Sequence, residues 1–191
     1  FFTMISSLIL GMGAPTTANY VITSTIAAPA IIKLGVPILA AHMFTFYFGI
    51  VADITPPVAL AAFAGAGIAK ANPMKTGINA TKIAIAAFLV PYIFVMSPQL
   101  LLINVHSVGE IIRVILGAAI GMLGVGTAVS GWVFTTASWP ERILLFAGGL
   151  MLIEPGLYTD LAGLGLLTAV FLFQWFKVAR IKGQAVAGEA R

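Results

Sequence analysis

The chain has 191 residues, of which 60% are hydrophobic and only 8% are charged, and its formal net charge is +4. Soluble domains carry about 25% charged residues, so this composition excludes a water-soluble domain and indicates an integral membrane protein. Apolar runs of helix length recur without strand-like alternation, which predicts an all-α polytopic membrane protein. The absence of cysteine excludes disulfides and thiolate metal sites. The positive charge lies mainly in loops and the tail, so it indicates topology and not nucleic-acid binding.

Two short apolar runs, Phe2–Leu10 and Tyr20–Ile32, flank a stretch rich in Gly, Pro and Thr, Gly11–Asn19. Each run is shorter than the roughly 20 residues that a helix needs to cross a bilayer. We therefore expect residues 1–36 to form a re-entrant helical hairpin with Gly11–Asn19 as its tip. A truncated span followed by a kinked span is the alternative.

A second interruption lies inside the apolar run Ile38–Ala69, at Asp53–Pro57. As one straight helix this run would be about 50 Å long, whereas the hydrocarbon core is about 30 Å thick. We therefore expect residues 37–70 to form a broken transmembrane helix whose second half starts at Pro56.

About four further spans are expected, each opened by a helix-start signal. Asn72 is expected as an N-cap with Pro73 at the first helical position, and the next span is Ile83–Ile103, so residues 71–104 form one unit. Residues 105–176 are expected to hold three C-terminal spans, and residues 177–191 a basic tail. These spans are Ile111–Phe134 and Ile143–Ile153, each after a capping box (Ser107 with Glu110, Ser138 with Glu141), and Leu161–Phe176, capped by Asp160.

The distribution of Lys and Arg sets the expected orientation. With the tail in the cytoplasm, the loop Lys70–Lys82 and Arg142 also fall inside, and only Lys33 and Arg113 fall outside. This agrees with the positive-inside rule and predicts a cytoplasmic C-terminus. Within the third-last span, Gly117 and Gly121 form a small-xxx-small pair, which either allows close helix approach or reflects ordinary glycine usage.

Asp53 is the acidic residue that lies inside an expected membrane segment without an obvious structural task. A carboxylate at mid-membrane costs about 2.5–3.5 kcal/mol, so it marks a functional site by default. The alternative is that Asp53 caps the second half-helix, and both roles are compatible. His42 is either a packing residue or a proton relay.

The prolines of the two interruptions lack an N–H group, so the carbonyls of Gly11, Ala52 and Asp53 should lose their helical partners. Bare carbonyls cannot face lipid, and with the side-chain oxygens of Thr16, Thr17, Asn19 and Thr55 they suit a hard cation such as Na⁺. The positive ends of the half-helices favour an anionic substrate. A pair of simple proline kinks is the alternative.

Signatures of soluble enzymes, such as GxxxxGK[ST], HExxH and GxSxG, do not occur. A catalytic pair would have to be Asp53 with His42, which are about 16 Å apart along one helix. We therefore expect no enzymatic activity and no bound cofactor.

Three segments carry a family resemblance: Gly11–Tyr20 (GMGAPTTANY), Ala40–Gly49 (AAHMFTFYFG) and Asp53–Ala61 (DITPPVALA). They resemble the large permease subunit of tripartite ATP-independent periplasmic (TRAP) transporters, and most of all its fused, TAXI-type branch. The resemblance covers about residues 1–100, and it implies that the chain is a C-terminal fragment of such a permease. It also implies the second inverted repeat of an elevator-type secondary transporter.

The resemblance implies partners and a site. The partners are a periplasmic TAXI-type solute-binding protein, a small membrane subunit or its fused equivalent, and an organic anion, in a bacterial inner membrane. Coupling would be to Na⁺ or to H⁺. The implied substrate-binding residues are Thr16, Thr17, Asn19 and Pro57, and the implied coupling-ion residues are Gly11, Gly13, Ala14, Thr17, Asp53, Thr55 and Pro56. The rival hypothesis is a non-transporting structural or assembly subunit.

Overall fold

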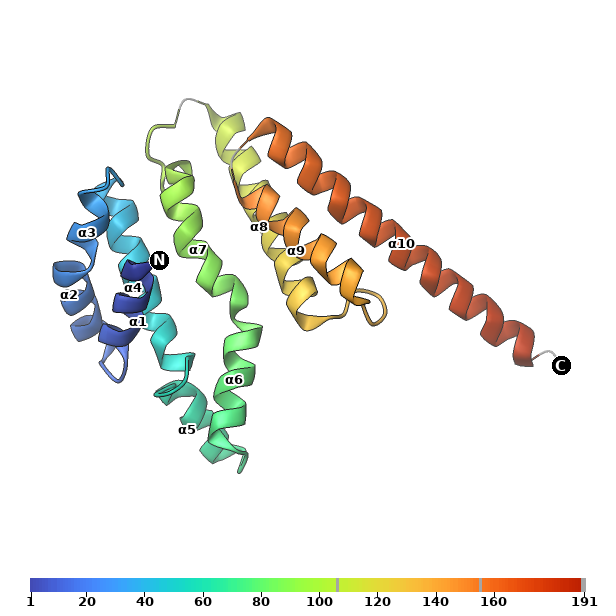
Figure 1. Cartoon of the computed structure of the whole chain (residues 1–191), viewed down its shortest axis with the longest axis horizontal. Helices are drawn as coiled ribbons and strands as arrows, with labels where there is room; N and C mark the ends of the chain where they lie inside the picture. Colours follow the sequence, from blue (N-terminus) through green and yellow to red (C-terminus); the bar gives the residue numbers. More distant parts are fainter. Residues whose placement is uncertain (106, 155, 190–191) are drawn as a thin grey trace. The chain divides into compact units, whose positions relative to one another are not determined.

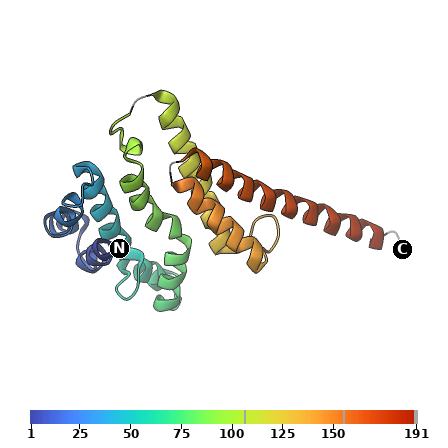
Figure 2. The ribbon, with the colours of Figure 1, turned by 45° about the horizontal axis from the view of Figure 1, so that its top comes forward.

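The computed structural model describes residues 1–105, 107–154 and 156–189. The chain divides into two compact units, Phe1–Val114 and Ile115–Arg191. Over the described residues the structure is helical, without a named strand, and both views in Figures 1 and 2 show helices joined by short connections. This confirms the predicted helical class, and each unit is taken by itself below.

The first unit opens with a pair of packed helices, α1 (Phe2–Gly11) and α2 (Thr16–Ile26), followed by the short α3 (Ala28–Ile32). The tip between α1 and α2 is narrower than the predicted Gly11–Asn19, because Thr16 already begins α2 (Figure 1). Pro15 explains the difference: its fixed φ suits the position before a helix, and it cannot donate to the preceding turn.

The long apolar run is interrupted, as predicted. It forms α4 (Ile38–Val51), a short 3-10 turn η1 (Ala52–Ile54) and α5 (Leu60–Ile68). The second half-helix begins at Leu60 and not at Pro56, and the Pro56–Pro57 peptide bond is cis. Ala59, directly before α5, adopts a left-handed conformation with φ 40° and ψ 47°. This conformation is unfavourable for a residue with a Cβ atom, so the break holds local strain.

The next helix starts at Pro73, as the sequence predicts. α6 (Pro73–Ile83) and α7 (Ile85–Met96) follow each other closely and are followed by the 3-10 turn η2 (Pro98–Leu101). Asn72 caps α6, since its Oδ1 accepts a hydrogen bond from the Lys75 N–H at 3.0 Å. Lys75 and Lys82, which mark the predicted basic loop Lys70–Lys82, therefore lie on a helix.

α4 lies at the centre of the first unit, in contact with α1, α2, α3 and α7. Phe44 and Phe48 of α4 are buried, and each packs edge-on against Tyr92 of α7. Met4 and Leu8 of α1 pack against the same cluster. Burying a Phe side chain stabilises by about 1.5–3 kcal/mol, so this cluster fixes where α1 sits on α4.

The second unit is formed by α8 (Val108–Ser130), α9 (Trp139–Ile153) and α10 (Leu157–Glu189), with the first turns of α8 belonging to the first unit. The capping box of Ser138 and Glu141 is present in full, as predicted. Asp160 does not cap α10, because the helix begins three residues earlier, at Leu157, and places this carboxylate in its first turn.

Glycines let α8 and α9 approach closely. A Cβ atom on Gly121 would lie 2.6 Å from the Gly149 carbonyl oxygen, and one on Gly117 would lie 3.1 Å from that of Leu152. Such distances leave no room for a side chain at Gly121. The Gly117–Gly121 pair therefore acts in helix packing, which decides between the two predicted readings.

Three helical stretches of the described chain are long and apolar enough to span a membrane: Pro73–Met96, Val108–Ser130 and Leu157–Ala179. The second of the three predicted C-terminal spans, Ile143–Ile153, is not among them. α9 has 15 residues, which gives about 22 Å of helix against a core of about 30 Å. α10 runs on beyond Phe176 to Glu189, so the described part of the predicted tail is helical, while Ala190 and Arg191 lie outside the described residues.

Candidate functional site

The predicted hairpin meets the broken helix at a contact between two glycines. A Cβ atom on Gly11, the last residue of α1, would overlap the Gly49 carbonyl oxygen of α4. Both helices end close to this point, α1 at Gly11 and α4 at Val51. The contact therefore brings the two interruptions of the chain together.

Asn19 of α2 completes this crossing. Its side chain is fully buried, and a Cβ atom on Gly49 would overlap its Oδ1 atom. Neither Oδ1 nor Nδ2 has a hydrogen-bond partner among the described residues. An unpartnered buried polar group typically costs about 1–3 kcal/mol, so an amide retained here calls for an explanation beyond packing.

The two interrupted stretches also lie close together. A Cβ atom on Gly13, in the turn after α1, would lie 3.9 Å from Cγ1 of Val58, in the break before α5. Gly13 has φ +75°, a conformation that favours glycine. The 3-10 turn η1 also contacts α1. The sequence-based hypothesis that the two interruptions meet is therefore consistent with this geometry.

The predicted loss of backbone partners is wrong for two of the three carbonyls. The Gly11 carbonyl accepts from the Ala14 N–H at 3.3 Å, and the Ala52 carbonyl accepts from the Thr55 N–H at 3.1 Å. The chain tightens into turns at both places, so shorter-range donors replace those that proline removes. Because each of these two oxygens already accepts a hydrogen bond, neither requires an ion as a partner.

Asp53 lies in η1, half-buried, and its buried Oδ1 has no partner in the described chain. It does not cap α5, which starts at Leu60 without a side-chain cap bond. The structural alternative for this carboxylate is therefore not supported. Thr55 Oγ1 donates to the Val51 carbonyl oxygen at 2.7 Å, so that hydroxyl is engaged within the broken helix.

α6 holds the break in place from the other side. Thr81 Oγ1 donates to the Ile54 carbonyl oxygen at 3.1 Å. A Cβ atom on Gly77 would lie 3.1 Å from Cγ of Pro56, so α6 packs closely on the prolines. Pro57 is exposed. The break is thus a defined conformation stabilised by tertiary contacts.

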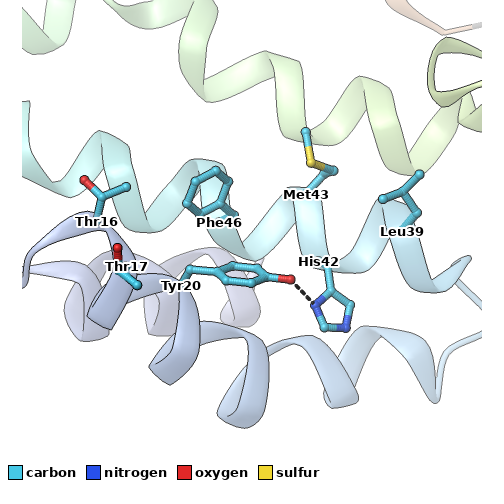
Figure 3. Close-up of a pocket in the computed structure, with 7 residues that line it drawn as sticks. All are labelled: Thr16, Thr17, Tyr20, Leu39, His42, Met43 and Phe46. Atoms are coloured by element: carbon cyan, nitrogen blue, oxygen red, sulfur yellow. Dashed lines mark hydrogen bonds between the residues drawn. The ribbon is translucent and has the colours of Figure 1, made fainter.

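A pocket of about 360 Å³ opens between the start of α2 and α4 (Figure 3). Four of its residues are spaced i, i+3, i+4 and i+7 along one face of α4. Its lining residues are Thr16, Thr17 and Tyr20 of α2 and Leu39, His42, Met43 and Phe46 of α4. Tyr20 Oη and His42 Nδ1 are 3.1 Å apart and hydrogen-bonded across the pocket. The volume is that of a small-molecule site, and the lining is mainly apolar.

The predicted site residues therefore fall into two groups. Thr16 and Thr17 line the pocket, whereas Gly11, Gly13 and Asn19 lie where the two interruptions meet. Asp53 lies in η1, which contacts α1. Ala14 lies in the turn between α1 and α2, where its N–H donates to the Gly11 carbonyl oxygen. The pocket lining does not include Asp53, Thr55, Pro56 or Pro57.

Sequence reasoning missed Tyr20 and Gly49 and left His42 open. The i, i+3, i+4, i+7 spacing of Leu39, His42, Met43 and Phe46, three of them apolar, was a usable signal for the pocket wall. The sequence held no signal for Gly49, because the role of a glycine inside an apolar helix depends on which residue packs against it.

Comparison with known families and proteins gives one match. Residues 1–108 match the model of the DctM component of the tripartite ATP-independent periplasmic transporter. No curated protein and no solved structure matches the chain. The match covers more than half of the 191 residues, including both interruptions and the pocket. The chain therefore belongs to the DctM family of TRAP transporter permeases, which are multi-pass membrane transporters working with a periplasmic solute-binding protein, and not enzymes.

Proposed function

We propose that this chain forms one half of the translocation site of a secondary active transporter that moves a small organic carboxylate across the bacterial inner membrane. The observation that carries the proposal is the meeting of the hairpin turn at Gly13 with the helix break at Val58. Irregular backbone at membrane depth is tolerated where it lines a cavity or a binding site. The chain would then be the second inverted repeat of an elevator-type transporter.

The start of α2 supports an anionic substrate. Thr16 and Thr17 lie at the N-terminus of this helix, which has no acidic residue in its first turn and no side-chain cap bond. The unpaired N–H groups of a helix N-terminus favour a carboxylate, and the two hydroxyls add donors beside them. The apolar wall from Leu39, Met43 and Phe46 would contact the substrate's carbon chain.

The unpartnered oxygens support a coupling ion. Asp53 Oδ1 and Asn19 Oδ1 are both buried without a hydrogen-bond partner among the described residues. Oxygen ligands from a carboxylate, an amide and nearby carbonyls are suited to Na⁺. A proton on Asp53 is the other way to neutralise this group, so coupling to H⁺ is retained as the second possibility.

The remaining parts of the proposal concern partners and orientation. We propose a periplasmic solute-binding protein of the TAXI type, and a small membrane subunit or its fused equivalent. Lys177 on α10 follows the apolar part of that helix, which supports a cytoplasmic C-terminus under the positive-inside rule.

The test is uptake into proteoliposomes by the complete transporter with its binding protein, using organic carboxylates that the binding protein retains. Wild type should accumulate substrate only with a Na⁺ or H⁺ gradient. The double variant T16V/T17V should lose roughly tenfold or more in uptake, because hydrogen bonds to a charged group contribute about 1.5–3 kcal/mol. Thr25→Val is the matched control, since Thr25 is exposed on the same helix and bonds only to carbonyls of that helix.

The rival reading, a structural or assembly subunit, draws support from the internally satisfied carbonyls of Gly11 and Ala52. The same experiment separates the two. Uptake that is absent under every gradient, or that is unaffected by T16V/T17V and by Asp53→Asn, would favour the structural role.

A further inference from the structure

The loop that joins α8 to α9, residues 131–138, and the start of α9 are tied to α10 by polar contacts. Thr135 Oγ1 donates to Gln174 Oε1 at 2.7 Å, and Gln174 Nε2 donates to Glu141 Oε2 at 2.7 Å. Lys177 Nζ donates to the Thr136 carbonyl oxygen at 3.2 Å. The loop therefore lies level with residues 174–177 of α10.

The residues around this loop and residues 174–177 of α10 are of the types found at a membrane–water interface. The chain has three tryptophans, and all of them, Trp132, Trp139 and Trp175, are exposed here. Lys177 follows at the point where α10 changes from apolar to basic. Exposed Trp beside Lys or Arg is typical of the headgroup region of a bilayer.

A groove of about 320 Å³ starts at this level and follows α9 toward its middle. Its walls come from the end of α8 (Ala128, Val129) and from successive turns of α9 (Trp139, Arg142, Ile143, Phe146, Ala147). Arg142 is the charged residue of the lining and lies in the first turns of α9, whereas Ile143, Phe146 and Ala147 follow it toward the apolar part of the helix.

Arg142 is held at the entrance by two hydrogen bonds and a ring contact. Its Nε donates to the Ala128 carbonyl oxygen at 2.7 Å and its Nη2 to that of Val129 at 3.0 Å. Its guanidinium carbon lies 5.1 Å from the centroid of the Trp139 ring. A guanidinium has five N–H donors, so these bonds leave donors for an anion. Gly131, with φ +71°, lies against the guanidinium and leaves it space.

We propose that this groove binds an anionic phospholipid, with the phosphate at Arg142 and one acyl chain along Ile143, Phe146 and Ala147. Charge complementarity identifies the occupant. Arg142 is the charged residue of the lining. The neighbouring acid, Glu141, is buried, hydrogen-bonded to Gln174 and paired with Lys177 at 3.9 Å, so it leaves the charge of Arg142 to an anion. A cation at the interface above an apolar channel matches a lipid with a charged head and a hydrocarbon tail.

The experiment is native mass spectrometry of the complete transporter, incubated with phosphatidylglycerol or with phosphatidylcholine of the same acyl chains. Wild type should retain phosphatidylglycerol about tenfold more strongly. Ala147→Trp fills the groove without touching the bonds of Arg142 and should abolish the preference. Leu144→Trp places the same ring on an exposed position of α9 outside the groove, and it should keep the preference.

Arg142→Gln should also abolish the preference, and thermal unfolding of this variant reports whether the loop still holds. Equal retention of both lipids by wild type would overturn the proposal, as would an unchanged preference in Ala147→Trp. Displacement of phosphatidylglycerol by inorganic phosphate alone would do the same, because it would identify a site for a free anion.

Discussion

The side-chain amide of Asn19 occupies the space beside Gly49 in which any other residue would place its Cβ atom. Three helices, α1, α2 and α4, meet at this point through Gly11, Asn19 and Gly49. A polar side chain thus serves as the contact between the hairpin and the broken helix. Its packing and its unpartnered amide lead to separate predictions.

Gly49→Ala should destabilise the first unit, because the added methyl group would overlap Asn19 Oδ1. Overpacking of this kind costs about 1–3 kcal/mol. Thermal unfolding of the purified protein checks the prediction, with Gly67→Ala as the control, since a Cβ atom on Gly67 meets nothing within 4 Å. Equal melting temperatures for the two variants would contradict the packing assigned to Asn19.

Asn19→Ala should leave stability almost unchanged while transport falls. Removing the side chain creates a small cavity, but it also removes two buried polar atoms that lack partners. We expect a change of about 1 kcal/mol or less in the free energy of unfolding. Uptake, measured in proteoliposomes, should fall by roughly tenfold if the amide binds the translocated species. A variant that melts much earlier and transports normally when folded would assign Asn19 to structure alone.

Thr81→Val should loosen the helix break. The hydroxyl bonds to the Ile54 carbonyl oxygen as well as to that of Gly77 within α6. Losing a hydrogen bond of this type costs about 0.5–1.5 kcal/mol. Hydrogen exchange should become faster at residues 54–60 and stay unchanged in α1. Thr76→Val is the matched control, because the Thr76 hydroxyl bonds only to the Asn72 carbonyl of the same segment, and it should leave the break protected.

Gln174→Ala should destabilise the second unit. It leaves the buried Glu141 and the hydroxyl of Thr135 without a shared partner. An unsatisfied buried group costs about 1–3 kcal/mol, and more when it is charged. The melting temperature should fall well below that of Leu172→Ala, which removes an exposed side chain from the same helix. Equal values would show that the polar network contributes no stability.

Local signals predicted much of the fold. The capping residues Asn72, Ser138 and Glu141 stand where the helices begin, because their side chains satisfy backbone groups within a few residues. The two proline-containing interruptions were also recognisable from local sequence, because proline cannot donate a backbone hydrogen bond within a helix. Helix lengths were harder to predict: α10 runs from Leu157 to Glu189, whereas the apolar pattern predicts only Leu161–Phe176.

The site was predictable in part. Thr16, Asn19 and Asp53 could be selected because polar groups are costly in a membrane segment. The fate of the Gly11 and Ala52 carbonyls was not predictable, since tight turns supplied donors that a helical template does not contain. Gly49 and the Tyr20–His42 hydrogen bond depend on which helices are neighbours, and sequence periodicity does not determine that.

The central claim is that the hairpin turn and the helix break form one functional unit, and a cross-link between Gly13→Cys and Val58→Cys tests it most directly. The chain contains no cysteine of its own. Methanethiosulfonate reagents with a short spacer should join the pair in the complete transporter, and Gly13→Cys with Thr25→Cys should remain unlinked. We expect the linked protein to stop taking up substrate and to recover when the link is reduced. Absence of the link, or full uptake by the linked protein, would contradict the account.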